Sequence, residues 1–234
     1  MRDHPNAIMM FAAGFGARMK HLTKDQPKPM ISVAAKPLVD YALELAREAN
    51  CDPIVANLHY KPDVLAQHLK DRGVVTVLEH PRLLETGGGL RNALPLLGDG
   101  PVFTINTDAV WAGPNPLTQL AAAWRPDKMD ALLMCIPTAR AIGHESKGDF
   151  SLAQDGRLNR GPGVIYSGVQ IIKTDRLALI KEAFFSLNLL WENMLKDGRL
   201  YGVSYCGKWC DVGHPSSIPL AEAIDKEREL LEPI

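Results

Sequence analysis

Short apolar runs alternate with amphipathic segments along the first half of the chain. Residues 7–13 form an apolar run that leads into glycines, which predicts a buried strand, whereas residues 37–49 carry apolar side chains at the spacing of a helix. Strands that alternate with helices predict an α/β fold of Rossmann-like architecture, with a mostly parallel central sheet and helices on both faces. The same patterns predict further strands at 53–57, 74–79 and 101–106 and further helices at 62–71 and 88–94.

The second half of the chain is less regular. Residues 148–156 fit a strand followed by a turn, and no internal repeat, low-complexity tract or linker interrupts the pattern. We therefore expect a single domain over residues 1–234, in which the second half is elaborated on the first. Strands are expected at 131–138 and 164–173, and helices at 187–196 and 217–231.

The composition is that of an ordinary globular protein, with 46% hydrophobic and 23% charged residues. The formal net charge of −1 and the scattered Lys and Arg residues give no electrostatic case for binding nucleic acid or an acidic membrane surface. The apolar run at 7–13 is too short to span a membrane, and no export signal is present. A cytoplasmic location with reduced cysteines is therefore expected.

Cys206, Cys210 and His214 stand at four-residue intervals, a spacing that raises the question of a metal site. A fourth ligand is missing, and Cys206 and Cys210 would share one face of a strand that runs into a turn. Structural cysteines are therefore the favoured interpretation.

A glycine-rich loop follows the first predicted strand. Gly14 and Gly16 permit positive φ angles and a close approach of main-chain N–H groups to phosphate, and Arg18 adds a planar cation that suits phosphate oxygens. Met19 stands where the dinucleotide-binding fingerprint requires its third glycine, so that fingerprint fails. The loop therefore indicates a phosphate site and disfavours a dinucleotide-dependent oxidoreductase.

Lys28 lies between two prolines just after this loop. Because both prolines restrict the backbone, we expect Lys28 in a stiff, extended segment. A lysine that only solubilises a surface needs no such rigidity, whereas one that bridges two phosphates gains from being held in place.

Two further features lie where predicted strands end. Gly87 and Gly88 belong to a run of three glycines at a strand-to-helix junction, where a glycine loop would let main-chain groups read the flat edge of a base. Asp108 follows a buried strand, where an unpaired carboxylate is costly and Mg²⁺ would remove that cost. Because ligands bind outside the carboxyl ends of parallel strands, Gly14 and Asp108 are expected at the same rim.

These motifs resemble those of the sugar-1-phosphate nucleotidyltransferases, whose pattern is roughly AAGxGTRM…LT…PKPL. The resemblance covers nearly the whole chain, and the most similar branch is that of the N-acetylmuramate-1-phosphate uridylyltransferases. The Glu-Glu-Lys-Pro segment typical of glucose-1-phosphate thymidylyltransferases is missing around 159–163. The matching runs are AAGFGARM at 12–19, PKPM at 27–30, ETGGG at 85–89, INTD at 105–108, GDF at 148–150, YSG at 166–168 and WCDVG at 209–213.

The resemblance implies a nucleotide-binding N-terminal half, an acceptor-binding C-terminal half, and UTP and a sugar-1-phosphate as substrates. It implies Mg²⁺ as cofactor, held by Asp108 and Asp211. Arg18 and Lys28 are implied as catalytic cations. At Ala17 many relatives carry Thr or Glu, so no side-chain contribution is expected there. The nucleotide-binding set is Gly14, Gly16, Ala17, Arg18, Lys28, Gly87 and Gly88, and the acceptor-binding set is Asn106, Gly148 and Asp149.

Several alternatives stand beside these assignments. Asn106 and Asp149 fit turn or capping roles equally well, and nothing in the sequence supports His59 as a general base. Other substrate pairs, such as GTP and mannose-1-phosphate, fit the same fold, and a catalytically silent nucleotide-sugar binder is an alternative of another class. If the acceptor carries a carboxylate, the arginines in the right segment to bind it are Arg140, Arg157 and Arg160.

Overall fold

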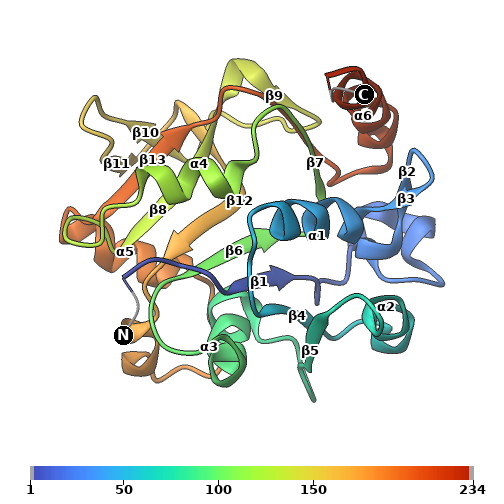
Figure 1. Ribbon diagram of the computed structural model, residues 1–234, viewed down its shortest axis with the longest axis horizontal. Coiled ribbons are helices and arrows are strands. Elements are labelled where there is room, and N and C mark those ends of the chain that lie inside the picture. Colours follow the sequence, from blue (N-terminus) through green and yellow to red (C-terminus); the bar gives the residue numbers. More distant parts are fainter. Residues whose placement is uncertain (1–2, 232–234) are drawn as a thin grey trace.

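A nine-stranded sheet forms the centre of the protein in the computed structural model, which describes residues 3–231 (Figure 1). Its strands follow the order β11-β10-β12-β6-β1-β4-β5, and β8 and β13 extend from β12 on a second branch. The strands are β1 (Ile8–Phe11), β4 (Ile54–Leu58), β5 (Val74–Leu78), β6 (Val102–Asn106), β8 (Ala131–Pro137), β10 (Phe150–Leu152), β11 (Leu158–Arg160), β12 (Val164–Ile172) and β13 (Leu200–Ser204).

The sheet is mostly parallel, as predicted. Strands β6, β1, β4 and β5 form a parallel block, and β8 and β13 form a second parallel pair. Strand β12 lies antiparallel to both β6 and β8, so it joins two blocks that run in the same direction. Within the described residues, only β12 and β11 oppose the common direction of the nine strands.

Helices cover both faces of the sheet, because successive side chains of each strand point to opposite sides. Ile8 and Met10 pack in one apolar cluster with α1 (Leu38–Glu48), α2 (Pro62–Leu69) and α4 (Pro116–Ala123). Met9 packs on the other face with α3 (Glu85–Leu97) and α5 (Asn188–Lys196). Figure 1 shows α3 and α5 on the side opposite α1 and α4.

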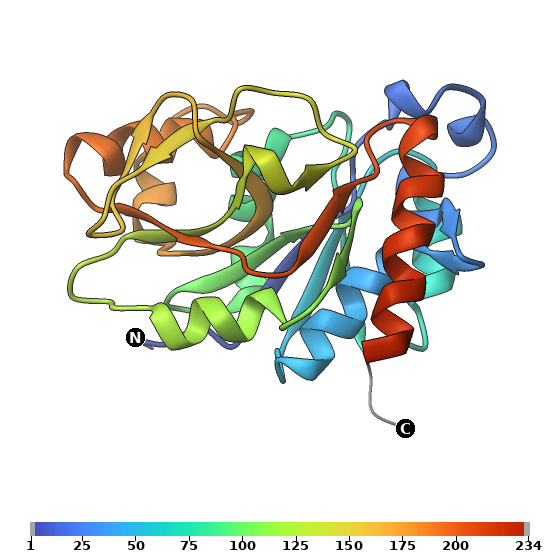
Figure 2. The ribbon, with the colours of Figure 1, turned by 90° about the horizontal axis from the view of Figure 1, so that it is seen from above.

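A smaller sheet carries the end of the chain back to the middle of the fold. Strand β14 (Lys208–Asp211) pairs with β7 (Ala109–Ala112) on one side and with β9 (Ala141–Ile142) on the other. The closing helix α6 (Ile218–Leu231) packs with these strands and α1 in a third apolar cluster (Figure 2). The remaining two strands, β2 (Ser32–Val33) and β3 (Lys36–Pro37), form a short hairpin.

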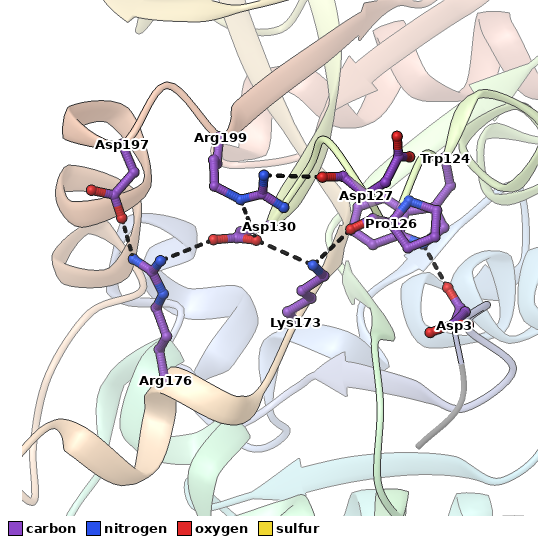
Figure 3. Close-up of polar contacts among 9 residues, drawn as sticks. All are labelled: Asp3, Trp124, Pro126, Asp127, Asp130, Lys173, Arg176, Asp197 and Arg199. Carbon is purple, nitrogen blue, oxygen red and sulfur yellow. Dashed lines mark hydrogen bonds and ion pairs between the residues drawn. The ribbon is translucent and has the colours of Figure 1, made fainter.

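An ion cluster joins three segments at the amino-terminal edge of the sheet (Figure 3). The Asp130 carboxylate, 8% exposed, precedes β8 and lies 2.8 Å from Arg199, 3.2 Å from Arg176 and 3.3 Å from Lys173. Arg176 also binds Asp197 at 2.6 Å. A buried carboxylate with several cationic partners is stable only while the partners remain, so the cluster fastens β8, β12 and β13 together.

The pattern located most elements within a few residues, and the misses have local causes. The hydrophobic pattern does not predict α4, β7 or β13, which are four to eight residues long. Helix α3 begins at Glu85 and not at Gly88, because the glycines lie inside its first turns. In residues 3–231, no helix combines the length and the apolar character that a bilayer crossing requires.

Candidate active site

The loop after β1 is shaped by Gly16. Its φ of 61° is left-handed, and a Cβ there would lie 2.7 Å from the Cβ of Lys28. The absence of a side chain therefore lets the loop lie directly on Lys28. The positive φ predicted for Gly14 is wrong; a Cβ at Gly14 would instead point into open space.

Lys28 is held in a 3-10 turn and not in the extended segment that the two prolines predicted. The turn spans Lys28–Met30 and follows Pro27, which is itself extended. Hydrogen bonds from the N–H of Met30 to Pro27 O at 2.9 Å and from the N–H of Ile31 to Lys28 O at 3.0 Å close it. The expected rigidity is present, although its geometry differs from the prediction.

The ammonium group of Lys28 meets the carboxylate of Asp108. Nζ of Lys28 lies 2.6 Å from Oδ2 of Asp108, and the two side chains are 12% and 30% exposed. Just before Asp108, the hydroxyl of Thr107 donates to Phe11 O at 2.9 Å and ties the ends of β1 and β6 together. The predicted common rim of Gly14 and Asp108 is confirmed, since both line one pocket at these strand ends.

Asp211 reaches the same rim through the pairing of β14 with β7. It lies opposite Ala109, and the next residue, Val212, donates its N–H to Asp108 O at 2.8 Å. Oδ2 of Asp211 lies 2.9 Å from Nδ1 of His144. His144 cannot be identified from the sequence, because nothing in its irregular local segment indicates that it pairs with Asp211.

Arg18 and Asp211 converge on Gly213. A Cβ at Gly213 would lie 3.2 Å from Nη2 of Arg18 and 3.2 Å from Oδ1 of Asp211. Glycine at this position therefore lets an exposed guanidinium group and a largely buried carboxylate approach the same point. The rim thus combines two carboxylates with two basic side chains, Lys28 and Arg18.

Two adjoining pockets open at this rim. The first, the loop-side pocket, has a volume of about 210 Å³ and includes Gly14, Lys28 and Asp108 in its wall. The second, the aromatic pocket, has a volume of about 260 Å³ and is lined by Asp149, Arg160 and a group of aromatic rings. The two pockets share Phe11, Thr86 and Asn106.

Of the residues predicted to bind the acceptor, Asn106 and Asp149 line the pockets, whereas Gly148 shapes the main chain beside them. Asn106 lies at the junction of the pockets, where Gly168 makes room for it, since a Cβ there would lie 2.8 Å from the Asn106 side chain. Asp149 lines the aromatic pocket and accepts a hydrogen bond from the N–H of Tyr166 at 2.9 Å. Gly148 has a φ of 101°, and a Cβ there would lie 2.6 Å from Gly163 N, so it allows a tight main-chain contact.

The glycines of α3 serve packing within the protein. The N–H groups of Gly87 and Gly88 donate to Phe185 O at 2.9 and 3.0 Å, and a Cβ at Gly87 would lie 2.4 Å from the Phe185 ring. These two N–H groups are therefore engaged within the protein, and the contact of this glycine segment with a base stays a prediction. On this side the loop-side pocket is lined by Leu83, Glu85 and Thr86.

A buried hydrogen-bonded chain forms the back wall of the loop-side pocket. The N–H of Ala12 donates to Asn57 Oδ1 at 2.8 Å, and Asn57 Nδ2 donates to Glu79 Oε1 at 2.7 Å. The other oxygen of Glu79, which is 1% exposed, accepts from the N–H of Leu84 at 2.7 Å. Both carboxylate oxygens are thus satisfied, as a buried charge requires, and the chain fixes the end of β1 to the start of α3.

Aromatic rings form the wall of the second pocket. Trp191 lies edge-on to Tyr166, with ring centroids 4.8 Å apart, and to Phe150 at 6.0 Å. The indole N–H of Trp191 donates to Gln170 Oε1 at 3.0 Å, which sets its orientation. Burial raises the pKa of Tyr166, so its phenol stays neutral.

The remaining histidine and cysteine alternatives lie outside the two pockets. His59 contacts Glu79 O through Nδ1 at 2.8 Å and packs edge-on against Phe15, and it lines neither pocket. Cys206 is exposed and its Sγ accepts a hydrogen bond from Gln119 Nε2 at 3.3 Å, whereas Cys210 is buried. In the described part of the chain, no group of three or more His, Cys, Asp and Glu side chains could hold a metal ion.

Comparison with known protein families places the chain in one of them. Residues 8–215 match the MobA-like NTP transferase domain. The chain belongs to this family. The match spans β1 to the turn that precedes α6, so it includes the glycine loop, both rim carboxylates and both pockets of this NTP transferase.

Curated relatives and a solved structure agree with this assignment. The NTP transferase chain is 39% identical to an N-acetylmuramate alpha-1-phosphate uridylyltransferase of Caulobacter vibrioides, with 95% of this chain and 98% of the relative covered. It is 30% identical to a protein of the same name from Neisseria meningitidis serogroup B, with 92% and 96% covered. The inositol-1-phosphate CTP transferase from T. maritima has the same fold, with a TM-score of 0.76, 17% identity, and 98% and 99% of the two chains covered. The sequence prediction of a sugar-1-phosphate nucleotidyltransferase family is confirmed.

Proposed function

We propose that this NTP transferase moves a uridylyl group from UTP to N-acetylmuramate-1-phosphate and releases pyrophosphate. The observation that carries the proposal is the Lys28–Asp108 pair, 2.6 Å apart, in a pocket that shares three wall residues with a second pocket. Two adjoining pockets, one of them with this charged pair in its wall, suit two phosphorylated substrates that must meet end to end.

In the proposed reaction, an oxygen of the sugar-1-phosphate attacks the α-phosphorus of UTP in line. The bond from the α-phosphorus to the oxygen that bridges to the β-phosphorus breaks, and pyrophosphate leaves with the electron pair. A phosphate oxygen is already anionic, so no general base is required. Lys28 stabilises charge on the transferred phosphoryl group, and Arg18 holds the leaving pyrophosphate.

Mg²⁺ fits the two rim carboxylates. Asp108 and Asp211 offer oxygen ligands, and each has one oxygen already paired, to Lys28 and to His144 respectively. The second oxygen of each carboxylate accepts no hydrogen bond from the described residues, and carboxylate oxygens are the ligands that Mg²⁺ selects. When bound there, the ion would supply further charge neutralisation for the phosphates. With two protein carboxylates, most of its coordination would come from substrate and water.

The acceptor and the nucleotide are proposed from the relatives together with the pockets. Two relatives that match nearly the whole chain carry the name N-acetylmuramate alpha-1-phosphate uridylyltransferase. The partly exposed ring of Tyr166 suits the apolar face of a sugar ring, and Asp149 at the same wall suits its hydroxyl groups.

A pyrophosphate-release assay tests this function. UTP, GTP and CTP are each paired with N-acetylmuramate-1-phosphate, N-acetylglucosamine-1-phosphate, glucose-1-phosphate and mannose-1-phosphate. The highest kcat/KM is expected for UTP with N-acetylmuramate-1-phosphate. Preference for GTP with mannose-1-phosphate would contradict it and favour the activity named in a rice relative that is 25% identical over 88% of this chain. Nucleotide-sugar binding without pyrophosphate release from any pair would indicate a silent binder.

A further inference from the structure

The structure separates the three arginines that the sequence left as alternatives. Arg157 binds the hydroxyl of Tyr201 and lines a different cavity near the opposite edge of the sheet. Arg140 is exposed and lines neither pocket of the site. Arg160, the last residue of β11, is the arginine in the wall of the aromatic pocket.

The guanidinium group of Arg160 is held firmly for a side chain that is 38% exposed. Its central carbon lies 4.5 Å from the centre of the Phe150 ring and 6.0 Å from that of Trp191. Nε donates to Glu192 Oε1 at 2.8 Å, and Nη2 donates to Asn188 Oδ1 at 2.7 Å. Stacking on two rings and two hydrogen bonds fix the plane of the group before any ligand arrives.

This arrangement leaves one edge of the guanidinium group available. Nη1 makes no hydrogen bond to any of the described residues, and Nη2 has a second N–H. These two nitrogens form the fork that binds both oxygens of a carboxylate. Because the group is already oriented, a carboxylate can bind there with little further loss of side-chain freedom.

We propose that Arg160 is a specificity-determining residue that binds a carboxylate carried by the acceptor sugar, remote from its phosphate. The inference rests on the proposed function and deepens it, since the lactyl ether of N-acetylmuramate supplies such a carboxylate and N-acetylglucosamine does not. The surrounding charges increase the dependence of carboxylate binding on Arg160. Asp149 in the pocket and Glu192 beside it are both acidic, so without Arg160 they would repel a carboxylated acceptor.

The test compares two acceptors in matched variants at saturating UTP. Arg160→Gln should raise KM for N-acetylmuramate-1-phosphate roughly 10- to 100-fold, the effect of losing a hydrogen-bonded charge pair, with kcat within a few fold. KM for N-acetylglucosamine-1-phosphate should change little. Arg160→Lys, which keeps the charge but not the fork, should fall between Gln and wild type. Arg157→Gln, a neighbouring arginine outside the pocket, is the control and should leave both acceptors unaffected.

A second substitution should change KM for N-acetylmuramate-1-phosphate in the opposite direction. Glu192→Gln removes a negative charge that partly neutralises Arg160, so KM for N-acetylmuramate-1-phosphate should fall a few fold while the other acceptor is unaffected. Equal losses with both acceptors in Arg160→Gln would overturn the inference and assign the residue a packing role. Wild-type enzyme that turns over other sugar phosphates but not N-acetylmuramate-1-phosphate would overturn the proposed acceptor and this inference together. Wild-type use of N-acetylmuramate-1-phosphate with unchanged selectivity in the variants would overturn the inference alone.

Discussion

Replacement of Lys28 by methionine isolates the charge of the side chain from its packing. Methionine keeps the carbons that lie against Gly16, where a Cβ would be only 2.7 Å from the Lys28 Cβ. The substitution removes the ammonium group 2.6 Å from Asp108, in the wall of the loop-side pocket. The fold should survive, because Asp108 is 30% exposed and water can solvate it after the loss of its partner.

The expected size of the effect follows from the position of the charge. Two unit charges about 4 Å apart interact by about 4 kcal/mol at an effective dielectric constant of about 20. If Lys28 exerts this attraction on the charge of the transferred phosphoryl group in the transition state, kcat/KM should fall by about a thousandfold. Lys28→Ala should lose at least as much, because it loses packing as well.

The measurement is steady-state pyrophosphate release with UTP and the acceptor, alongside thermal unfolding of each variant. Lys24→Met is the matched control, since Lys24 is an exposed lysine of the same segment and lines neither pocket. A Lys28→Met enzyme with unchanged thermal stability and kcat/KM within tenfold of wild type would refute a role for Lys28 in phosphate transfer.

Three further predictions address the metal, the stability and the thiols. Activity should vanish with EDTA. Asp108→Asn should weaken the binding of Mg²⁺, measured by calorimetry in the presence of UTP, because an amide is a weaker ligand than a carboxylate. An Asp108→Asn enzyme that binds Mg²⁺ with wild-type affinity would contradict the metal role of Asp108. Asp130→Ala should lower the free energy of unfolding, measured by urea denaturation, by about 3 kcal/mol, because it leaves three cations without their shared carboxylate. The KM values should stay unchanged. A loss below about 1 kcal/mol would show that the cluster is dispensable for stability. When the native protein is treated with Ellman's reagent, the exposed Cys206 should react and the buried thiols should not, because burial raises the pKa of Cys51, Cys135 and Cys210 to about 12. Fast reaction of a second thiol would argue against this burial.

The parts of the site that sequence predicted well are those with local causes. Asp108 follows a buried apolar run, and in a parallel sheet such a residue lies at the ligand-binding rim whatever the rest of the chain does. Gly16 was recognised because its backbone needs a positive φ, which is a property of the loop itself. Lys28 was identified by its flanking prolines, although the turn they form is 3-10 and not extended.

Features that depend on distant partners were missed. The glycine run suggests a base site at Gly87, but it does not reveal the Phe185 ring, which lies about 100 residues further along the chain and excludes any side chain at Gly87. The buried Glu79 and its partner Asn57 are separated by 22 positions, and neither residue shows the pairing in its own neighbourhood. His144 is likewise defined only by Asp211, which β14 brings next to it. Such pairings become visible only once the strand order is known.

The return of β14 to β7 also sets the order in which the protein can become active during synthesis. Asp108 and the glycine loop belong to the first half of the chain, but Asp211 arrives about 100 residues later, through a pairing that closes a long loop at a substantial cost in chain entropy. A nascent chain that ends before β14 lacks one of the two rim carboxylates and the third core cluster that α6 completes. Such a chain cannot assemble the full rim. The strand pairing therefore delays completion of the rim until nearly the entire polypeptide has been synthesised.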